Sequence, residues 1–203
     1  MTKRFLLAAA LIGAAPLAGC ISFGAKPPPS LLTLDAAASV PAGQVQSSAT
    51  AKTITIAVPA VPQALATQRV PVQTGETQVA YIDEALWVEQ PARLFARLMA
   101  DTVSARTGRV VLGAAQSYGD PGARLTGDLR RFGVLADSRE AVVTFDAALV
   151  RDGGAPGAPA GAVEKRRFEA RVPVTAIDAT NAGTALNRAA NQVATEVADW
   201  VGR

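Results

Sequence analysis

The stretch that decides the fold is AVVTFDAALVRDGGAPGAPAGAVEKRRFEARVPV, which spans residues 141–174. Apolar and polar side chains alternate on both sides of a Gly/Pro/Ala-rich connection, which is typical of two half-buried strands joined by a loop. The residues expected to share the buried face are Val143, Phe145, Ala147 and Leu149 in the first strand and Phe168, Ala170, Val172 and Val174 in the second. In the second strand, the alternating residues Arg167, Glu169 and Arg171 should face water. One-sided burial of this kind predicts an antiparallel sheet covered on one face.

The chain before this stretch supplies further strands. Residues 123–135 form a third long alternating segment, and residues 52–58 alternate until a proline stops the pattern. Residues 68–82 are typical of a hairpin with a glycine turn, and Pro71 in its first arm favours an edge position. A short strand is expected at 109–112.

Two segments have the helical period. Pro91 and Gly108 bracket the first, since proline favours the first turn of a helix and glycine its end. The apolar residues on one side of this helix are Leu94, Phe95, Leu98, Met99, Thr102 and Val103, and those of a second helix within 181–201 are Leu186, Ala190, Val193, Val197 and Val201. Each set forms one stripe that must be buried. The prediction is therefore one α+β domain over residues 51–203, a mainly antiparallel sheet with two amphipathic helices packed on one face.

The N-terminus has the features of a bacterial secretion signal. Lys3 and Arg4 precede an uncharged apolar run over residues 5–19, which is too short to span a bilayer comfortably. Leu17-Ala18-Gly19-Cys20 then resembles the lipobox of bacterial lipoproteins, so residues 1–19 are expected to be a signal peptide and Cys20 to be acylated. Cys20 is the only cysteine in the chain, so it has no disulfide partner here.

The segment after Cys20 is expected to be a tether over residues 20–50. Three consecutive prolines within 24–30 favour an extended spacer, and residues 31–35 are a possible short first strand. Residue 21 is isoleucine and not aspartate, which by resemblance to a common Gram-negative sorting rule favours delivery to the outer membrane.

The composition argues against most catalytic schemes. The chain has no histidine, the commonest general base and metal ligand, so neither an enzyme nor a metal or other cofactor is expected. Asp83 and Glu84 are the obvious carboxylate pair, but neighbours on a strand point to opposite sides. Removing residues 1–19 leaves 18 basic against 17 acidic residues. Without a basic stripe, nucleic-acid binding is not expected either.

The stretch IAVPAVPQALATQRVPVQTGETQVAYIDEALWVEQPARLFARLM, residues 56–99, carries a family resemblance. A strand ending in proline, a Leu-x-Thr-x-Arg step from Leu65 to Arg69, Tyr81 and then Ala-x-Trp ending at Trp87 precede a proline-led helix. Together they resemble the auxiliary lipoprotein component of ABC-type transport systems, the PqiC-like family. Later strands and the closing helix extend the resemblance over residues 30–201.

The resemblance implies a non-catalytic component of an ABC/MCE-type lipid transport system between two membranes. Its partners would be an MCE-type protein and an ABC permease/ATPase complex, with the domain docking or stabilising the assembly on the periplasmic face of the outer membrane. Tyr81 and Trp87 are candidates for partner docking, since such residues often anchor interfaces; alternatively they cover the sheet edge or the helix start. The alternative function is a structural envelope lipoprotein that binds peptidoglycan or an outer-membrane assembly partner.

Overall fold

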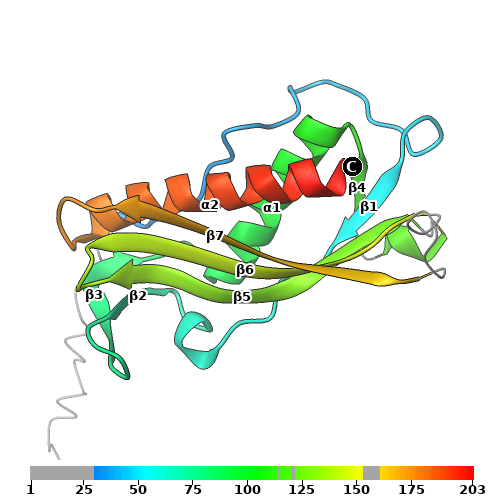
Figure 1. The fold of residues 1–203 in the computed structure, drawn as a ribbon. Helices are drawn as coiled ribbons and strands as arrows, with labels where there is room; N and C mark the ends of the chain where they lie inside the picture. The colour runs from blue at the N-terminus through cyan, green and yellow to red at the C-terminus, as the bar shows by residue number, and fades with distance from the viewer. Residues whose placement is uncertain (1–29, 114, 120–121, 153–160) are drawn as a thin grey trace, which may run out of the picture.

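The computed structural model describes residues 30–113, 115–119, 122–152 and 161–203 of the chain. The signal peptide predicted over residues 1–19 and the predicted acylation site Cys20 lie outside this part. In chain order the elements are β1 (Thr53–Ile56), η1 (Gln63–Leu65, a 3₁₀ turn), β2 (Arg69–Gln73), β3 (Val79–Leu86), α1 (Pro91–Thr107), β4 (Val110–Leu112), η2 (Gln116–Gly119, a second 3₁₀ turn), β5 (Ala123–Leu135), β6 (Glu140–Val150), β7 (Val163–Pro173) and α2 (Ala179–Val201). Figure 1 shows the long strands as one twisted layer beneath α2.

The long strand β5 organises the sheet. Along one edge it pairs antiparallel with β6, which pairs antiparallel with β7, so the three long strands predicted over residues 123–174 form an antiparallel meander. Its other edge is shared end to end by two short parallel strands: β1 pairs with residues 123–125 and β2 with residues 134–135. Outside these, β4 lies parallel to β1 and β3 antiparallel to β2. All seven strands thus form one sheet.

The prediction of a mainly antiparallel sheet is wrong, because the sheet is mixed. The pairs β1–β4, β1–β5 and β2–β5 are parallel, whereas β2–β3, β5–β6 and β6–β7 are antiparallel. Parallel neighbours require a long crossover connection, and the chain supplies one through α1 between β3 and β4. Alternation of apolar residues reports which face of a strand is buried but not the direction of its neighbour.

Pro71 does not lie on an edge strand. Its strand β2 lies between β3 and β5, and the register shifts between Arg69 and Pro71. A proline is tolerated at such an irregularity because the ladder needs no N–H there. On β5, a side chain at Gly133 would bring a Cβ within 2.5 Å of the Pro71 carbonyl oxygen, so only glycine fits beside this bulge.

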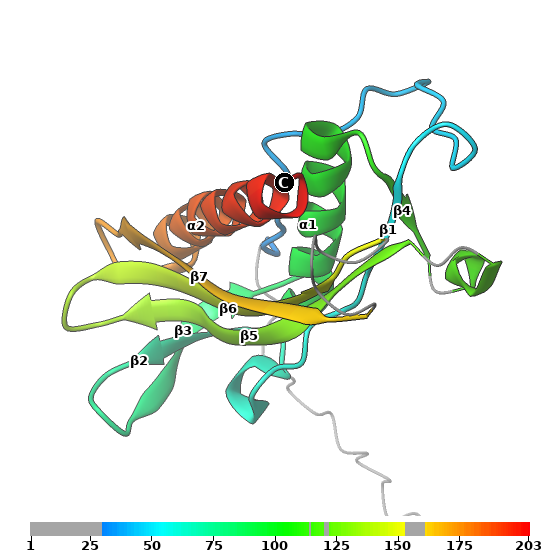
Figure 2. The ribbon, with the colours of Figure 1, turned by 45° about the vertical axis from the view of Figure 1, so that its right-hand side comes forward.

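Both helices cover the same face of the sheet, as predicted (Figures 1 and 2). Pro91 occupies the first turn of α1, and Gly108 ends it in the left-handed conformation with φ of 69°. At the start of α2, an Asp178 side-chain oxygen accepts a hydrogen bond from the Asn181 amide. Every residue expected on the apolar stripes of the two helices is buried. The core is therefore the layer between the helix pair and one face of the sheet.

The segment before β1 lies along α2. The possible first strand at 31–35 is a single parallel bridge, in which Leu32 donates to the Leu86 carbonyl and accepts from the Val88 amide. Further on, the amides of Asp35 and Ala37 donate to the side-chain oxygens of Asn187 and Asn191 on α2. Two asparagines one helical turn apart thus hold the backbone of an extended segment.

Candidate functional site

Trp87 belongs to the core and not to a surface. Its side chain is 1% exposed, and its ring centroid lies 5.4 Å from that of Phe132 on β5. Phe95 of α1 continues the aromatic cluster against the same phenylalanine. The indole N–H finds no hydrogen-bond partner among the described residues. Of the two roles considered from the sequence, Trp87 has the structural one. It covers the core between the end of β3 and the start of α1.

Tyr81 lies on the edge strand β3 and is half-buried. Its hydroxyl donates to the Ala64 carbonyl in η1 at 3.4 Å, and the Arg69 guanidinium lies 4.4 Å from its ring centroid. A cation over an aromatic face contributes about 0.5–1 kcal/mol at an exposed site. Tyr81 thus ties η1 to the β2–β3 hairpin, while part of its surface stays open to solvent.

A hollow of about 190 Å³ lies where η1 meets the sheet. In Figure 1, η1 hangs beneath β5, on the face away from the two helices. The walls come from η1, the β2–β3 hairpin and the sheet itself, and their side chains are mostly apolar. Its apolar lining includes Ala64, Leu65, Pro71, Val79 and Val142. This hollow is therefore an apolar concavity on the face that the helices leave uncovered.

Two adjacent arginines border the hollow because β5 carries a bulge. Leu129 pairs with Phe145 and Arg131 with Thr144, so Arg130 is an extra residue between them. A bulge changes the direction in which side chains point. Arg130 lies 3.8 Å from the Asp146 carboxylate, and the charge of Arg131 lowers the pKa of Glu169. Both arginine side chains therefore lie on the uncovered face.

The rest of the uncovered face carries ion pairs within β7 and between β6 and β7. Asp146 accepts two hydrogen bonds from the Arg167 guanidinium, at 2.5 and 2.7 Å. Glu169 accepts from the Thr144 hydroxyl at 2.8 Å and from Arg171 at 2.9 Å. Opposite charges placed across antiparallel strands stabilise the pairing. These acids are therefore engaged by partners on β6 and β7.

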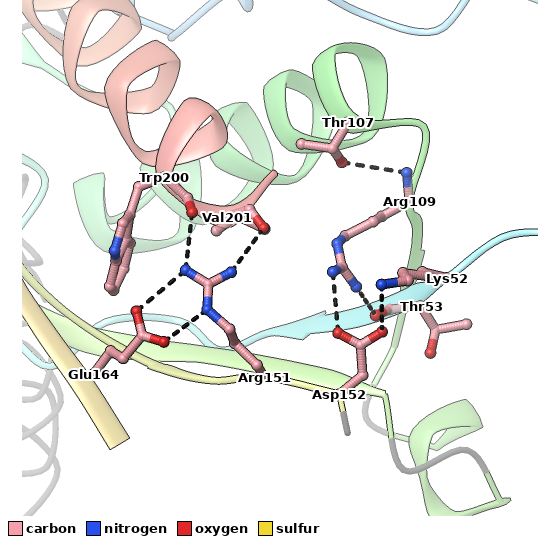
Figure 3. A network of polar contacts seen from close by, with 9 residues as sticks. All are labelled: Lys52, Thr53, Thr107, Arg109, Arg151, Asp152, Glu164, Trp200 and Val201. Carbon is pink, nitrogen blue, oxygen red and sulfur yellow. Dashed lines mark hydrogen bonds and ion pairs between the residues drawn. The ribbon is translucent and has the colours of Figure 1, made fainter. Parts of the chain in front are cut away.

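At the far end of the sheet, a second charged cluster holds the chain on both sides of the β6–β7 connection (Figure 3). Arg109, just after α1, donates to the Thr53 carbonyl and to the Asp152 carboxylate, each at 3.0 Å. Lys52 lies 3.9 Å from the same carboxylate. The Arg109 side chain is only 10% exposed, so this pair joins α1, β1 and the end of β6 in a partly dry environment.

Arg151 joins the end of β6 to β7 and to the C-terminal end of α2. Its guanidinium donates to the carbonyls of Trp200 and Val201 and pairs with both oxygens of Glu164 on β7 (Figure 3). A cation at the C-terminus of a helix satisfies carbonyls that have no partner within the helix and complements the helix dipole. Arg151 and Asp152 directly precede a Gly/Pro/Ala-rich stretch, so their position next to a loop is the only signal that the sequence gives.

The ion pairs change the pKa values of several carboxyl groups. Burial alone would raise the pKa of Asp152, but the hydrogen bond and charge of Arg109, with Lys52, lower it below its usual value. The other carboxyl groups whose pKa is lowered are Asp146, Glu164, Glu169 and Asp178. Hydrogen bonds are the largest cause in each, from Arg167, Arg151, Thr144 and the Asn181 amide in that order. The pKa of Asp101 shifts in the opposite direction, since burial raises it.

These shifts predict an acid-sensitive fold. A carboxyl group whose pKa is lower in the folded than in the unfolded chain stabilises the fold above its unfolded pKa, and this contribution is lost as the pH falls. The unfolded values are near 3.8 for Asp and 4.5 for Glu. We expect thermal unfolding midpoints that change little between pH 7 and pH 5 and fall below about pH 4.5. A midpoint that is highest below pH 4 would contradict the ion-pair assignment.

The described part of the chain contains no assembled site for a metal ion. No group of three or more Cys, Asp or Glu side chains gathers there in an arrangement that could hold one. Asp83 and Glu84 are exposed, and a carboxylate oxygen of Asp83 accepts from the Glu84 amide. Over the same residues, no helix is long and apolar enough to cross a membrane.

The fold defines an α+β domain in which one sheet face packs against two helices and the other is charged, with a small apolar hollow. The sequence comparison then identifies the family. The chain belongs to the ABC-type transport auxiliary lipoprotein component family, whose model matches residues 32–198. The resemblance read from the sequence is thereby confirmed.

Solved structures agree on the fold. Protein XCC0632 from Xanthomonas campestris, of the DUF330 family, is 17% identical with a TM-score of 0.64; the match covers 84% of this chain and 94% of that one. A crystal structure of an uncharacterized protein is 19% identical with a TM-score of 0.61, covering 74% of this chain and 92% of the other. At these identities the likeness concerns the fold alone. Among curated proteins no match was found.

Proposed function

We propose that this protein is a non-catalytic outer-membrane lipoprotein of an ABC/MCE-type system that moves lipid between two membranes. In this role it docks or stabilises the transport assembly at the outer membrane. The observation that carries the proposal is the family match over residues 32–198, with the lipobox-like cysteine a short distance upstream. The family is that of a transport auxiliary component, which agrees with a role in binding rather than in catalysis.

The position of the first described residues supports a close membrane attachment. Nine residues lie between Cys20 and Ser30, so the ten chain steps, at most about 3.6 Å each, span about 36 Å in total. Leu32 is hydrogen-bonded beside Trp87, at the end of β3. An acylated Cys20 would therefore keep this end of the domain within about 36 Å of the bilayer. Strand β4 and the C-terminal end of α2 lie at the opposite end of the long strands from β3 (Figure 1).

Replacing the cysteine tests the anchor. We expect Cys20→Ser to abolish acylation, because serine lacks the thiol to which the lipid is attached. Two or three acyl chains hold a protein on a membrane far more firmly than one, so their loss should leave the protein uncleaved or mislocalised. Membrane fractionation, metabolic labelling with palmitate and intact-mass measurement provide the readouts. Ser22→Ala, two residues further on, is the matched control and should behave as wild type. A Cys20→Ser variant that still fractionates as a mature outer-membrane protein would overturn the proposal of lipidation.

A further inference from the structure

We propose that the hollow between η1 and the sheet binds a single acyl chain whose anionic head group is held by Arg130 and Arg131. The inference goes beyond the proposed function, since docking at the outer membrane requires no ligand in this domain. It rests on three features of the uncovered sheet face: the apolar lining of the hollow, its size, and the pair of arginines at its border.

The lining and size of the hollow favour a linear hydrocarbon. Ala64 and Leu65 of η1, Pro71 and Val79 of the hairpin, and Val142 of β6 present apolar surface to it. Its volume of about 190 Å³ is below the roughly 300–1,000 Å³ of sites for drug-sized molecules. A space of this size takes up one short chain segment and excludes two chains side by side. Each methylene removed from water should strengthen binding about four-fold.

The arginines supply charge complementarity for an anionic head group. Within the part of the chain that the structure describes, no carboxylate oxygen lies within 4.0 Å of the Arg131 guanidinium. Arg130 has only the Asp146 carboxylate at 3.8 Å, and Asp146 is already bound through both oxygens by Arg167. Guanidinium groups bind carboxylates and phosphates through paired hydrogen bonds, so two adjacent ones suit such an anion.

The neighbouring structure keeps this arrangement in place. Tyr81 holds η1 against the hairpin through the Ala64 carbonyl, and this contact fixes one wall of the hollow. Leu129 is fully buried on the helix side of the sheet. Because it precedes Arg130 directly, it fixes the position of the backbone at the bulge. Glu169, the acid that Arg131 influences, is bonded to Thr144 and Arg171. A head group would therefore meet two cations whose nearest acids are engaged elsewhere.

The test is a titration of the folded domain, residues 30–203, with sodium dodecanoate below its critical micelle concentration. This part contains every helix and strand that the structure describes. We expect saturable 1:1 binding by calorimetry, with amide NMR shifts concentrated at Gly133 and Val142. Decanoate should bind more weakly by about fifteen-fold, since it lacks two methylenes. Uncharged dodecanol should also bind at least ten-fold more weakly than dodecanoate.

Three variants separate the parts of the site. Arg130→Ala/Arg131→Ala should weaken dodecanoate binding at least ten-fold while leaving dodecanol unaffected, and Ala64→Leu should block both by filling the hollow. Arg124→Ala, an exposed arginine elsewhere on β5, is the matched control and should change nothing. Absence of saturable binding, or equal weakening by Arg124→Ala, would overturn the inference. So would full binding by Ala64→Leu. Each of these results leaves the docking role untouched, because that role is measured by partner capture.

Discussion

Replacing Trp87 by alanine is expected to lower the free energy of unfolding by about 3–5 kcal/mol. The indole is 1% exposed and packs on Phe132, so its removal leaves a cavity between the sheet and α1. Small domains have only about 5–15 kcal/mol of stability in total, so the loss should be visible as a large fall in the urea midpoint. Urea unfolding followed by circular dichroism measures it.

Two further variants distinguish a core role for Trp87 from a docking role. Trp87→Phe keeps an aromatic ring and removes an N–H that has no partner among the described residues, so we expect a loss below about 1.5 kcal/mol. Val88→Ala changes the next residue, which is 44% exposed, and should alter stability by less than about 0.5 kcal/mol. If Trp87→Ala unfolds at the wild-type urea concentration, the placement of Trp87 in the core is wrong.

Arg109→Ala is expected to destabilise the fold by about 2–3 kcal/mol. Breaking a fully buried ion pair from one side costs about 3–5 kcal/mol, because the remaining charge stays buried. The Asp152 side chain is 23% exposed and Lys52 lies near it, so solvent and the lysine reduce the cost. The variant also removes the donor to the Thr53 carbonyl. Urea unfolding at neutral pH provides the measurement.

An exposed arginine–aspartate pair in the same protein provides the control. Arg106 and Asp199 join the ends of α1 and α2 at 2.7 Å, with side chains 40% and 49% exposed. Exposed pairs contribute about 0–1 kcal/mol, so Arg106→Ala should cost less than half as much as Arg109→Ala. Equal losses in the two variants would show that Arg109 does not act through a buried pair. We also expect Arg109→Met/Asp152→Leu to lose less stability than Arg109→Ala alone.

The parts of the fold that the sequence predicted are those governed by local periodicity. Alternation over residues 141–174 predicted the meander, and the 3.6-residue period predicted both helices, because one buried face imposes these patterns directly. Strand direction imposes no such pattern, so the parallel pairs of β1 and β2 with β5 were missed. Pro71 was likewise assigned to an edge, whereas a bulge accommodates it inside the sheet.

The candidate sites depended on contacts between distant parts of the chain. Trp87 and Tyr81 were singled out together from their residue types, but only packing distinguishes a buried indole from a half-buried phenol. The adjacent Arg130 and Arg131 interrupt the alternation of β5, which is a local signal of the bulge. In contrast, Arg109 and Asp152 are 43 residues apart, and no local pattern joins them.

The most direct measurement of the proposed role is capture of partners from the cell envelope. The full-length protein, tagged at its C-terminus and crosslinked in intact cells, should recover an MCE-type protein in quantitative mass spectrometry, with the ABC permease as a second component. The Cys20→Ser variant, expressed at the same level, should recover much less, because it is not held at the outer membrane. Recovery of peptidoglycan or of an outer-membrane assembly protein without any MCE-type protein would contradict the account and would favour a structural envelope lipoprotein.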